Sequence, residues 1–169
     1  GTLVLQRDRK SSTNIIFFLL LINFILWNTV SYLSIQNFDL QLRLLLVRII
    51  LFYAVSQSYL LFLFVYTFPK KNISLGKRPL TLISILASVV SILVLTPLVF
   101  SDLKIDPIKQ QATPIVQPGV IGFALTAIGL LSAAIIQLFK KFYSSHGFER
   151  EQVRFLLAGF LATFALIVF

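Results

Sequence analysis

The sequence predicts an all-α fold, a polytopic transmembrane helix bundle, and three observations support this class. Apolar residues make up 57% of the 169-residue chain and charged residues only 12%, whereas soluble domains average about 25% charged residues. The mean hydropathy is +0.91. The apolar residues are also gathered in stretches of about 20 residues, which is the length that an α-helix needs to cross a bilayer.

The apolar stretches predict five membrane-spanning helices in one bundle that covers residues 1–169. They lie at residues 14–35, 44–68, 80–100, 120–139 and 155–169, and the last stops with the chain. We expect residues 1–5 to be the tail of an earlier apolar helix. Because the sequence holds no Met and stops inside an apolar run, we expect both ends to be cut from a longer protein.

The polar links between these stretches alternate in charge. Residues 6–10, 69–79 and 140–154 are rich in Lys and Arg, whereas residues 34–41 and 101–119 are close to neutral. Successive links of a multi-pass protein lie on opposite sides of the membrane, and short links rich in Lys and Arg remain in the cytoplasm. We therefore expect the three basic links to be cytoplasmic.

The outer link and the small residues give more detailed expectations. Prolines in 101–119 exclude a helix interior there, and the extended character of 109–117 predicts a short hairpin over the mouth of the bundle. Pro97 is expected to kink the outer end of the third helix. Small residues at helical spacing predict close helix contacts; they are Gly122, Thr126, Gly129 and Ala133 in the fourth helix, and Ser84, Ala87, Ser88 and Ser91 in the third.

The composition excludes several kinds of chemistry. The chain has no Cys and a single His, so we expect no metal site and no thiol catalysis. Its six acidic residues all lie outside the apolar stretches, which argues against a proton-relay transporter and against acid–base hydrolysis within the membrane. We expect no catalytic residue, no cofactor and no enzyme activity in this part of the protein. The charge of +9 is explained by the basic links, and nucleic acid is not an expected partner.

Ser56 and Gln57, followed by Ser58, are candidate ligand-binding residues because they fall near the middle of the second helix. A Gln side chain that faced lipid would leave its donors and acceptor unpaired, so Gln57 should face the bundle. The cluster either binds a ligand or couples a signal, or it forms the interhelical hydrogen bonds that commonly fix helix packing.

Arg48 is a further candidate, because it lies more than a turn deeper in the same helix than Arg43. A charge inside a membrane segment is a functional hypothesis by default. Arg48 could bind an anionic ligand or a lipid headgroup. Alternatively it extends to the interface, or it pairs with Asp39 or with a loop carbonyl.

The order of several short motifs resembles the N-terminal seven-transmembrane sensor region of bacterial histidine kinases and of some diguanylate cyclases. The first is a basic link that leads into an Asn-led helix with a Trp, RDRKSSTNIIFFLLLINFILW at residues 7–27. A TFP boundary follows at residues 67–69 and a Thr-Pro step at 96–97. The stretch EREQVRFLLAG at residues 149–159 is similar to the family's Arg-Gln-x-Arg-x-x-Leu-x-Gly pattern, with Glu151 inserted after the first Arg.

The resemblance implies a sensory input domain of a bacterial signal-transduction protein in the inner membrane. The five helices would be the second to the sixth of seven, and they would relay a signal to a cytoplasmic output domain that lies outside this chain. The implied partners are the lipid bilayer, an unknown small ligand or membrane signal, and a second copy if the protein is a kinase. The alternatives are a small transporter or channel-like protein and a structural subunit of a membrane complex.

Overall fold

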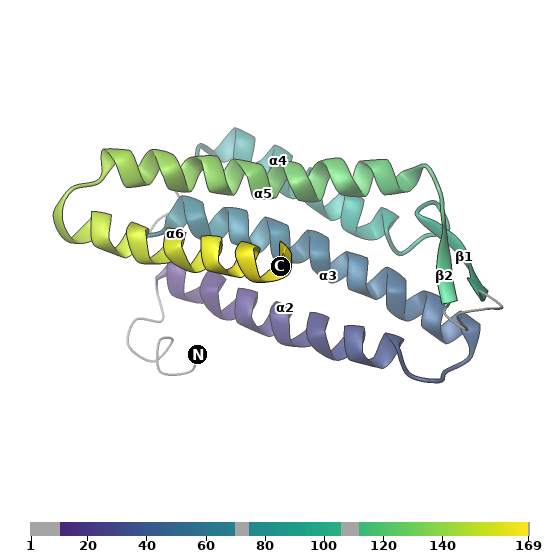
Figure 1. Cartoon of the computed structure of the whole chain (residues 1–169). Coiled ribbons are helices and arrows are strands. Elements are labelled where there is room, and N and C mark those ends of the chain that lie inside the picture. Colours follow the sequence, from purple (N-terminus) through teal and green to yellow (C-terminus); the bar gives the residue numbers. More distant parts are fainter. Residues whose placement is uncertain (1–10, 70–74, 106–111, 169) are drawn as a thin grey trace.

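The computed structural model describes residues 11–69, 75–105 and 112–168. Five helices and one β-hairpin lie in these residues (Figure 1). Residues 1–5 and the basic link 6–10 fall outside the described part of the chain. The elements are α2 (Ser12–Ser34), α3 (Leu40–Thr67), α4 (Lys77–Leu93), β1 (Phe100–Ile105), β2 (Ala112–Val116), α5 (Gly119–Ser144) and α6 (Gly147–Val168).

The bundle is built around α3, which packs against α2, α4 and α5, while α6 packs on α5 (Figure 1). One apolar cluster joins α3 to α5 and α6, and it includes the buried side chains of Phe62, Leu138 and Val153. A second joins α3 to α4 and to the segment that leads into β1, and it includes Val55 and Val99. The long central helix therefore takes part in both cores.

The helices α2, α3 and α5 are each long and apolar enough to cross a membrane. Helix α4 has 17 residues, which is about 25 Å at 1.5 Å per residue and less than the bilayer's hydrocarbon thickness of about 30 Å. The apolar stretch 80–100 is therefore not one continuous helix. The helix ends at Leu93, and the chain continues as a turn.

Pro97 explains this difference, since the helix ends before it and is not merely kinked. The carbonyl of Leu93 would normally accept the N–H of residue 97, which a proline lacks. Thr96 takes this role instead. Its backbone N–H and its Oγ1 both donate to the Leu93 oxygen, at 3.0 and 2.6 Å.

A hairpin does lie in the outer link, but only its second strand falls within the predicted residues 109–117, and its first strand precedes them. Strands β1 and β2 are antiparallel, with Phe100 opposite Val116 and Leu103 opposite Pro114. Phe100 and Leu103 are buried, at 8% and 6% exposed. The hairpin therefore rests on the bundle through β1, which the sequence analysis had not assigned as a strand.

The basic link 140–154 is mostly helical, in contrast to the loop predicted from its charges. Helix α5 extends to Ser144 and α6 starts at Gly147, so the connection is only two residues long. Lys and Arg are good helix formers, and helices can continue beyond the hydrocarbon. The reversal of direction uses Gly147, whose φ of +58° lies in the left-handed region that favours glycine.

The seam of small residues predicted on α5 is also wrong in part. A Cβ placed on Gly122 or Gly129 would meet nothing within 4 Å. The buried residues of α5 are Thr126, Leu130, Ala134 and Leu138. The packed face is thus rotated from the predicted one, and Leu130 and Leu138 as well as the small Ala134 pack against α3.

Candidate functional site

Arg48 holds the hairpin to the central helix. Its Nε and Nη2 both donate to the backbone oxygen of Phe100, at 3.2 and 2.7 Å. Within the described residues Arg48 forms no ion pair with a carboxylate. The partner found is a backbone carbonyl, as one alternative proposed, but it belongs to strand β1 and not to a loop. This carbonyl belongs to the first residue of β1, so the guanidinium ties the start of the hairpin to α3.

The two other candidates, Ser56 and Gln57, do not share a site. Ser56 lines a groove between helices, and its Oγ donates to the Phe52 carbonyl at 2.9 Å. Gln57 does not line this groove, and its Oε1 is buried without a hydrogen-bond partner in the part of the chain that the structure describes. Consecutive helical residues are about 100° apart around the axis, and this rotation separates them.

The groove lies between α2, α3 and α4 and has a volume of about 560 Å³. Its walls are mostly apolar, with Leu19 and Ile22 from α2, Leu60 from α3 and Ile92 from α4. Its six polar lining residues are Asn23, Ser56, Tyr59, Ser84, Ser88 and Ser91. The groove therefore combines an apolar wall with a few polar groups, as small-molecule sites do.

A hydrogen bond between α3 and α4 crosses one end of this groove. The hydroxyl of Tyr59 and the Oγ of Ser84 are 2.6 Å apart, and Ser84 also donates to the Leu80 carbonyl at 2.7 Å. Tyr59 was missed as a candidate from the sequence, because a Tyr in an apolar helix carries no signal of its partner. Ser84, Ser88 and Ser91 were predicted only to form a packing seam. Their spacing along one face of α4 was the sequence feature that could have indicated a polar wall.

Gln57 faces α2, as the packing of two aromatic rings indicates. The rings of Phe17 and Phe64 are 5.7 Å apart, which sets the register of these antiparallel helices. Gln57 lies seven residues from Phe64, on the same helical face and about 10 Å along the axis. The equivalent position on α2, seven residues after Phe17, is Phe24, which is adjacent to Asn23. The buried Gln57 Oε1 and Asn23 Oδ1, both without hydrogen-bond partners, therefore lie at a similar depth.

Comparison with known families identifies the chain. A family model described as the N-terminal 7TM region of histidine kinase matches residues 1–169. The chain belongs to this family. No curated protein and no solved structure matches it. The resemblance and the helical membrane fold expected from the sequence are thereby confirmed, and membership implies a membrane sensory region, which is the non-catalytic input part of a histidine kinase.

At the other end of the bundle from the hairpin, this histidine kinase 7TM region ties α5 to the end of α3. The Nζ of Lys141 donates to the backbone oxygen of Val65, at 2.6 Å, and to that of Phe68. These carbonyls belong to the C-terminal turn of α3, where helices leave carbonyls unpaired and favour a cation. A polar cavity of about 500 Å³ lies beside Lys141 and includes His146 and Glu149.

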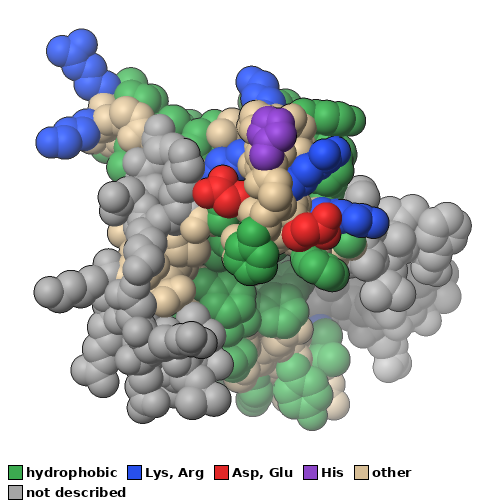
Figure 2. All heavy atoms as spheres, turned by 90° about the vertical axis from the view of Figure 1, so that its left-hand side faces the viewer, with side chains coloured by type: hydrophobic (Ala, Val, Ile, Leu, Met, Phe, Trp, Pro, Cys, Tyr) green, Lys and Arg blue, Asp and Glu red, His purple; other side chains and the backbone are tan. Residues whose placement is uncertain are grey.

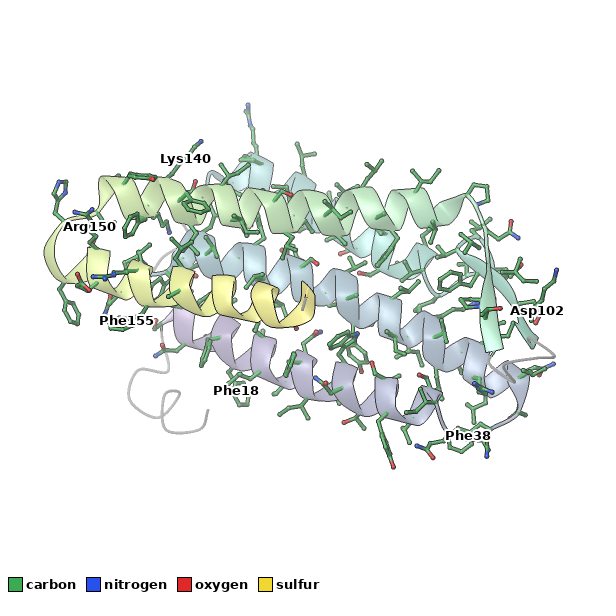
Figure 3. The ribbon with its side chains drawn as sticks, viewed as in Figure 1. Phe18, Phe38, Asp102, Lys140, Arg150 and Phe155 are labelled. Carbon is green, nitrogen blue, oxygen red and sulfur yellow. The ribbon has the colours of Figure 1, made fainter. Side chains whose placement is uncertain are left out.

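Several basic side chains of the 7TM region lie at this same end, among them Lys140, Lys141 and Arg150. Figure 2 views this end of the bundle, and Lys, Arg, His and acidic side chains lie over its upper part, with apolar side chains between and below them. Figure 3 shows Lys140 and Arg150 at this end and Asp102 at the opposite end, on the hairpin. The bundle thus has a basic end and a hairpin end.

Proposed function

We propose that this chain is the membrane-embedded input domain of a bacterial signalling protein of the histidine kinase type, and that it relays a signal to a cytoplasmic output domain. The observation that carries the proposal is the family match, which extends over the whole chain. In this proposal the five helices act as one bundle of membrane spans near residues 14–35, 44–68, 80–100, 120–139 and 155–169, the third of which consists of α4 and the turn that follows it.

Helix α3 is the element best placed to relay a signal. It has 28 residues, which is about 42 Å at 1.5 Å per residue. The groove lies at its middle, the Arg48 bond to the hairpin at one end, and the Lys141 bonds at the other. A shift of α3 that is favoured by a ligand or by the membrane state would therefore change contacts at both ends. A ligand can favour such a shift only if it binds the two packings with different affinity.

The proposed orientation places the basic end in the cytoplasm of the inner membrane, with the links 69–79 and 140–154 on that side together with 6–10. The positive-inside rule supports this. The chain has no Cys, so single-cysteine variants test it directly. In spheroplasts, an impermeant maleimide should label Asp102→Cys and leave Lys140→Cys unlabelled until the cells are opened. Labelling of both from outside would overturn the orientation.

The relay itself is tested with the full-length protein that carries this region, reconstituted in lipid nanodiscs. Tyr59→Phe removes the hydroxyl that joins α3 to α4, and we expect it to change the rate of autophosphorylation several-fold. Thr81→Ala is the matched control, since the Thr81 hydroxyl bonds only to the Lys77 carbonyl within its own helix. Equal rates in both variants and the parent would contradict a relay through this contact.

The same nanodiscs test the proposed homodimer. Mass photometry should give the mass of two chains per disc at protein concentrations at which kinase activity is measured. Solute flux through the protein in sealed liposomes, without any phosphorylation, would instead favour the transporter alternative.

A further inference from the structure

The groove between α2, α3 and α4 contains polar groups without hydrogen-bond partners. Asn23 is 9% exposed and lines the groove, and its Oδ1 has no hydrogen-bond partner among the described residues. Ser88 and Ser91 also line the groove, and in the described part of the chain neither hydroxyl forms a hydrogen bond. By contrast, the hydroxyls of Ser56 and Ser84 bond to carbonyls four residues earlier.

The depth of these groups makes the missing partners significant. Asn23 lies at the centre of α2, a helix long and apolar enough to cross the membrane. Water is absent at that depth, so a polar group without a hydrogen-bond partner is unfavourable there. An occupant that offers a hydrogen-bonding group at this level would remove the penalty.

The size of the groove favours a compact occupant over a membrane-spanning helix. The groove runs from Ser84 to Ile92 on α4, which is about 12 Å at 1.5 Å per residue. A helix that spanned the bilayer would be about 30 Å long, so most of its length would lie outside this groove. The backbone groups of such a helix would already be bonded within it. The helix could therefore pair with the Asn23 amide and the hydroxyls of Ser88 and Ser91 only through a polar side chain that faced them. A volume of about 560 Å³ lies within the range of small-molecule sites, roughly 300–1,000 Å³.

We propose that this groove binds a lipid-soluble ligand with an aliphatic body and one hydrogen-bonding group, a hydroxyl, carbonyl or amide. The aliphatic part lies against Leu19, Ile22 and Leu60, and the polar group meets Asn23 and the serines of α4. The ligand enters from the bilayer. This inference rests on the proposed sensory function and names the class of ligand that the groove senses.

The test uses dodecanol that carries a diazirine on its chain, added to the full-length protein in nanodiscs. After illumination, mass spectrometry maps the labelled residues. We expect saturable labelling of groove residues that unlabelled dodecanol competes away and dodecane does not, because the alkane leaves the polar groups unpaired. The double variant Ser88→Ala/Ser91→Ala should weaken competition by dodecanol about 3- to 10-fold, as expected for the loss of one or two hydrogen bonds.

A neighbouring pair of substitutions separates blocking of the groove from a general effect on α4. Ser88→Phe fills the groove, while Val89→Phe adds the same ring to a side chain that is 54% exposed and does not line it. Saturable labelling should be lost in the first and kept in the second. Labelling that is lost equally in both, or that dodecane competes as well as dodecanol, would overturn the proposal.

The outcomes for the ligand and for the relay can be told apart. Labelling that never saturates, or cross-links between two copies at this groove, would refute the ligand site even if Tyr59→Phe alters autophosphorylation. Conversely, saturable labelling of the groove with no effect of dodecanol on autophosphorylation would uphold the site and refute its role in sensing.

Discussion

Gly119, the first residue of α5, provides the sharpest test of how the hairpin end is packed. A Cβ at this position would lie 2.4 Å from the Leu98 oxygen and 2.9 Å from the Leu98 carbonyl carbon. The Gly119 N–H also donates to the same oxygen at 3.0 Å. The Gly119→Ala substitution must therefore push α5 away from the turn that carries Val99, a fully buried residue of the second core cluster.

The magnitude follows from these contacts. Real Cβ atoms almost never approach within 3.0 Å, so the backbone must move by at least about 0.6 Å. Overpacking of this kind costs about 1–3 kcal/mol, and a strained or lost hydrogen bond adds about 0.5–1.5 kcal/mol. Alanine returns up to about 1 kcal/mol through its higher helix propensity. We expect a net loss of about 1–3 kcal/mol in the free energy of unfolding.

The assay is equilibrium unfolding in mixed micelles, with increasing SDS and far-UV circular dichroism as the readout. Gly122→Ala is the matched control, because a Cβ there meets nothing within 4 Å. The control should be neutral or slightly stabilising, and Gly119→Ala should unfold at a lower SDS fraction. If both variants unfold at the same SDS fraction, the close approach of α5 to the turn is refuted.

Two further predictions concern the bonds at the ends of α3. Arg48→Met removes two hydrogen bonds from a charged group, which are worth about 1.5–3 kcal/mol. Trypsin should therefore cleave after the exposed Lys104 of β1 roughly 10- to 100-fold faster. The control is Arg43→Met, on the same helix but without a bond from its Nε to the described residues, and it should leave the cleavage rate unchanged. Lys141→Met should speed amide hydrogen exchange in the last turn of α3 by a similar factor, because the carbonyls there lose their cation. Substitution of the exposed Lys140 by Met should leave the exchange rate unchanged. Equal exchange in the two variants would disprove that Lys141 anchors α5 to the end of α3.

Much of the local structure was predictable from the sequence. The apolar stretches gave the order of the five helices, and the basic links gave the end at which charges gather. The motifs at residues 7–27 and 149–159 indicated the family that the comparison confirmed. Helix ends were less predictable: the proline effect at residue 97 was recognised, but the hydroxyl and N–H of Thr96 that stop α4 at Leu93 depend on local geometry that spacing does not give.

The candidate site shows where sequence reasoning stops. Arg48 was recognised as unusual, and a loop carbonyl was among its predicted partners, but only the fold brings the Phe100 oxygen to it across 52 positions of sequence. Ser56 and Gln57 were grouped because they are adjacent in the chain, whereas the helical rotation directs them to different neighbours. Tyr59 and Ser84 acquire meaning only as a pair.

By itself the sequence determined the membrane environment and the order of the apolar helices, because hydrophobicity and charge act residue by residue and are written directly in the order of the chain. The tertiary structure alone decided which polar groups find partners. Hydrogen bonds depend on ångström distances between helices that are far apart in sequence, and so the bonded Arg48 and Lys141 and the unpaired Asn23, Ser88 and Ser91 could be distinguished only once the helices were packed.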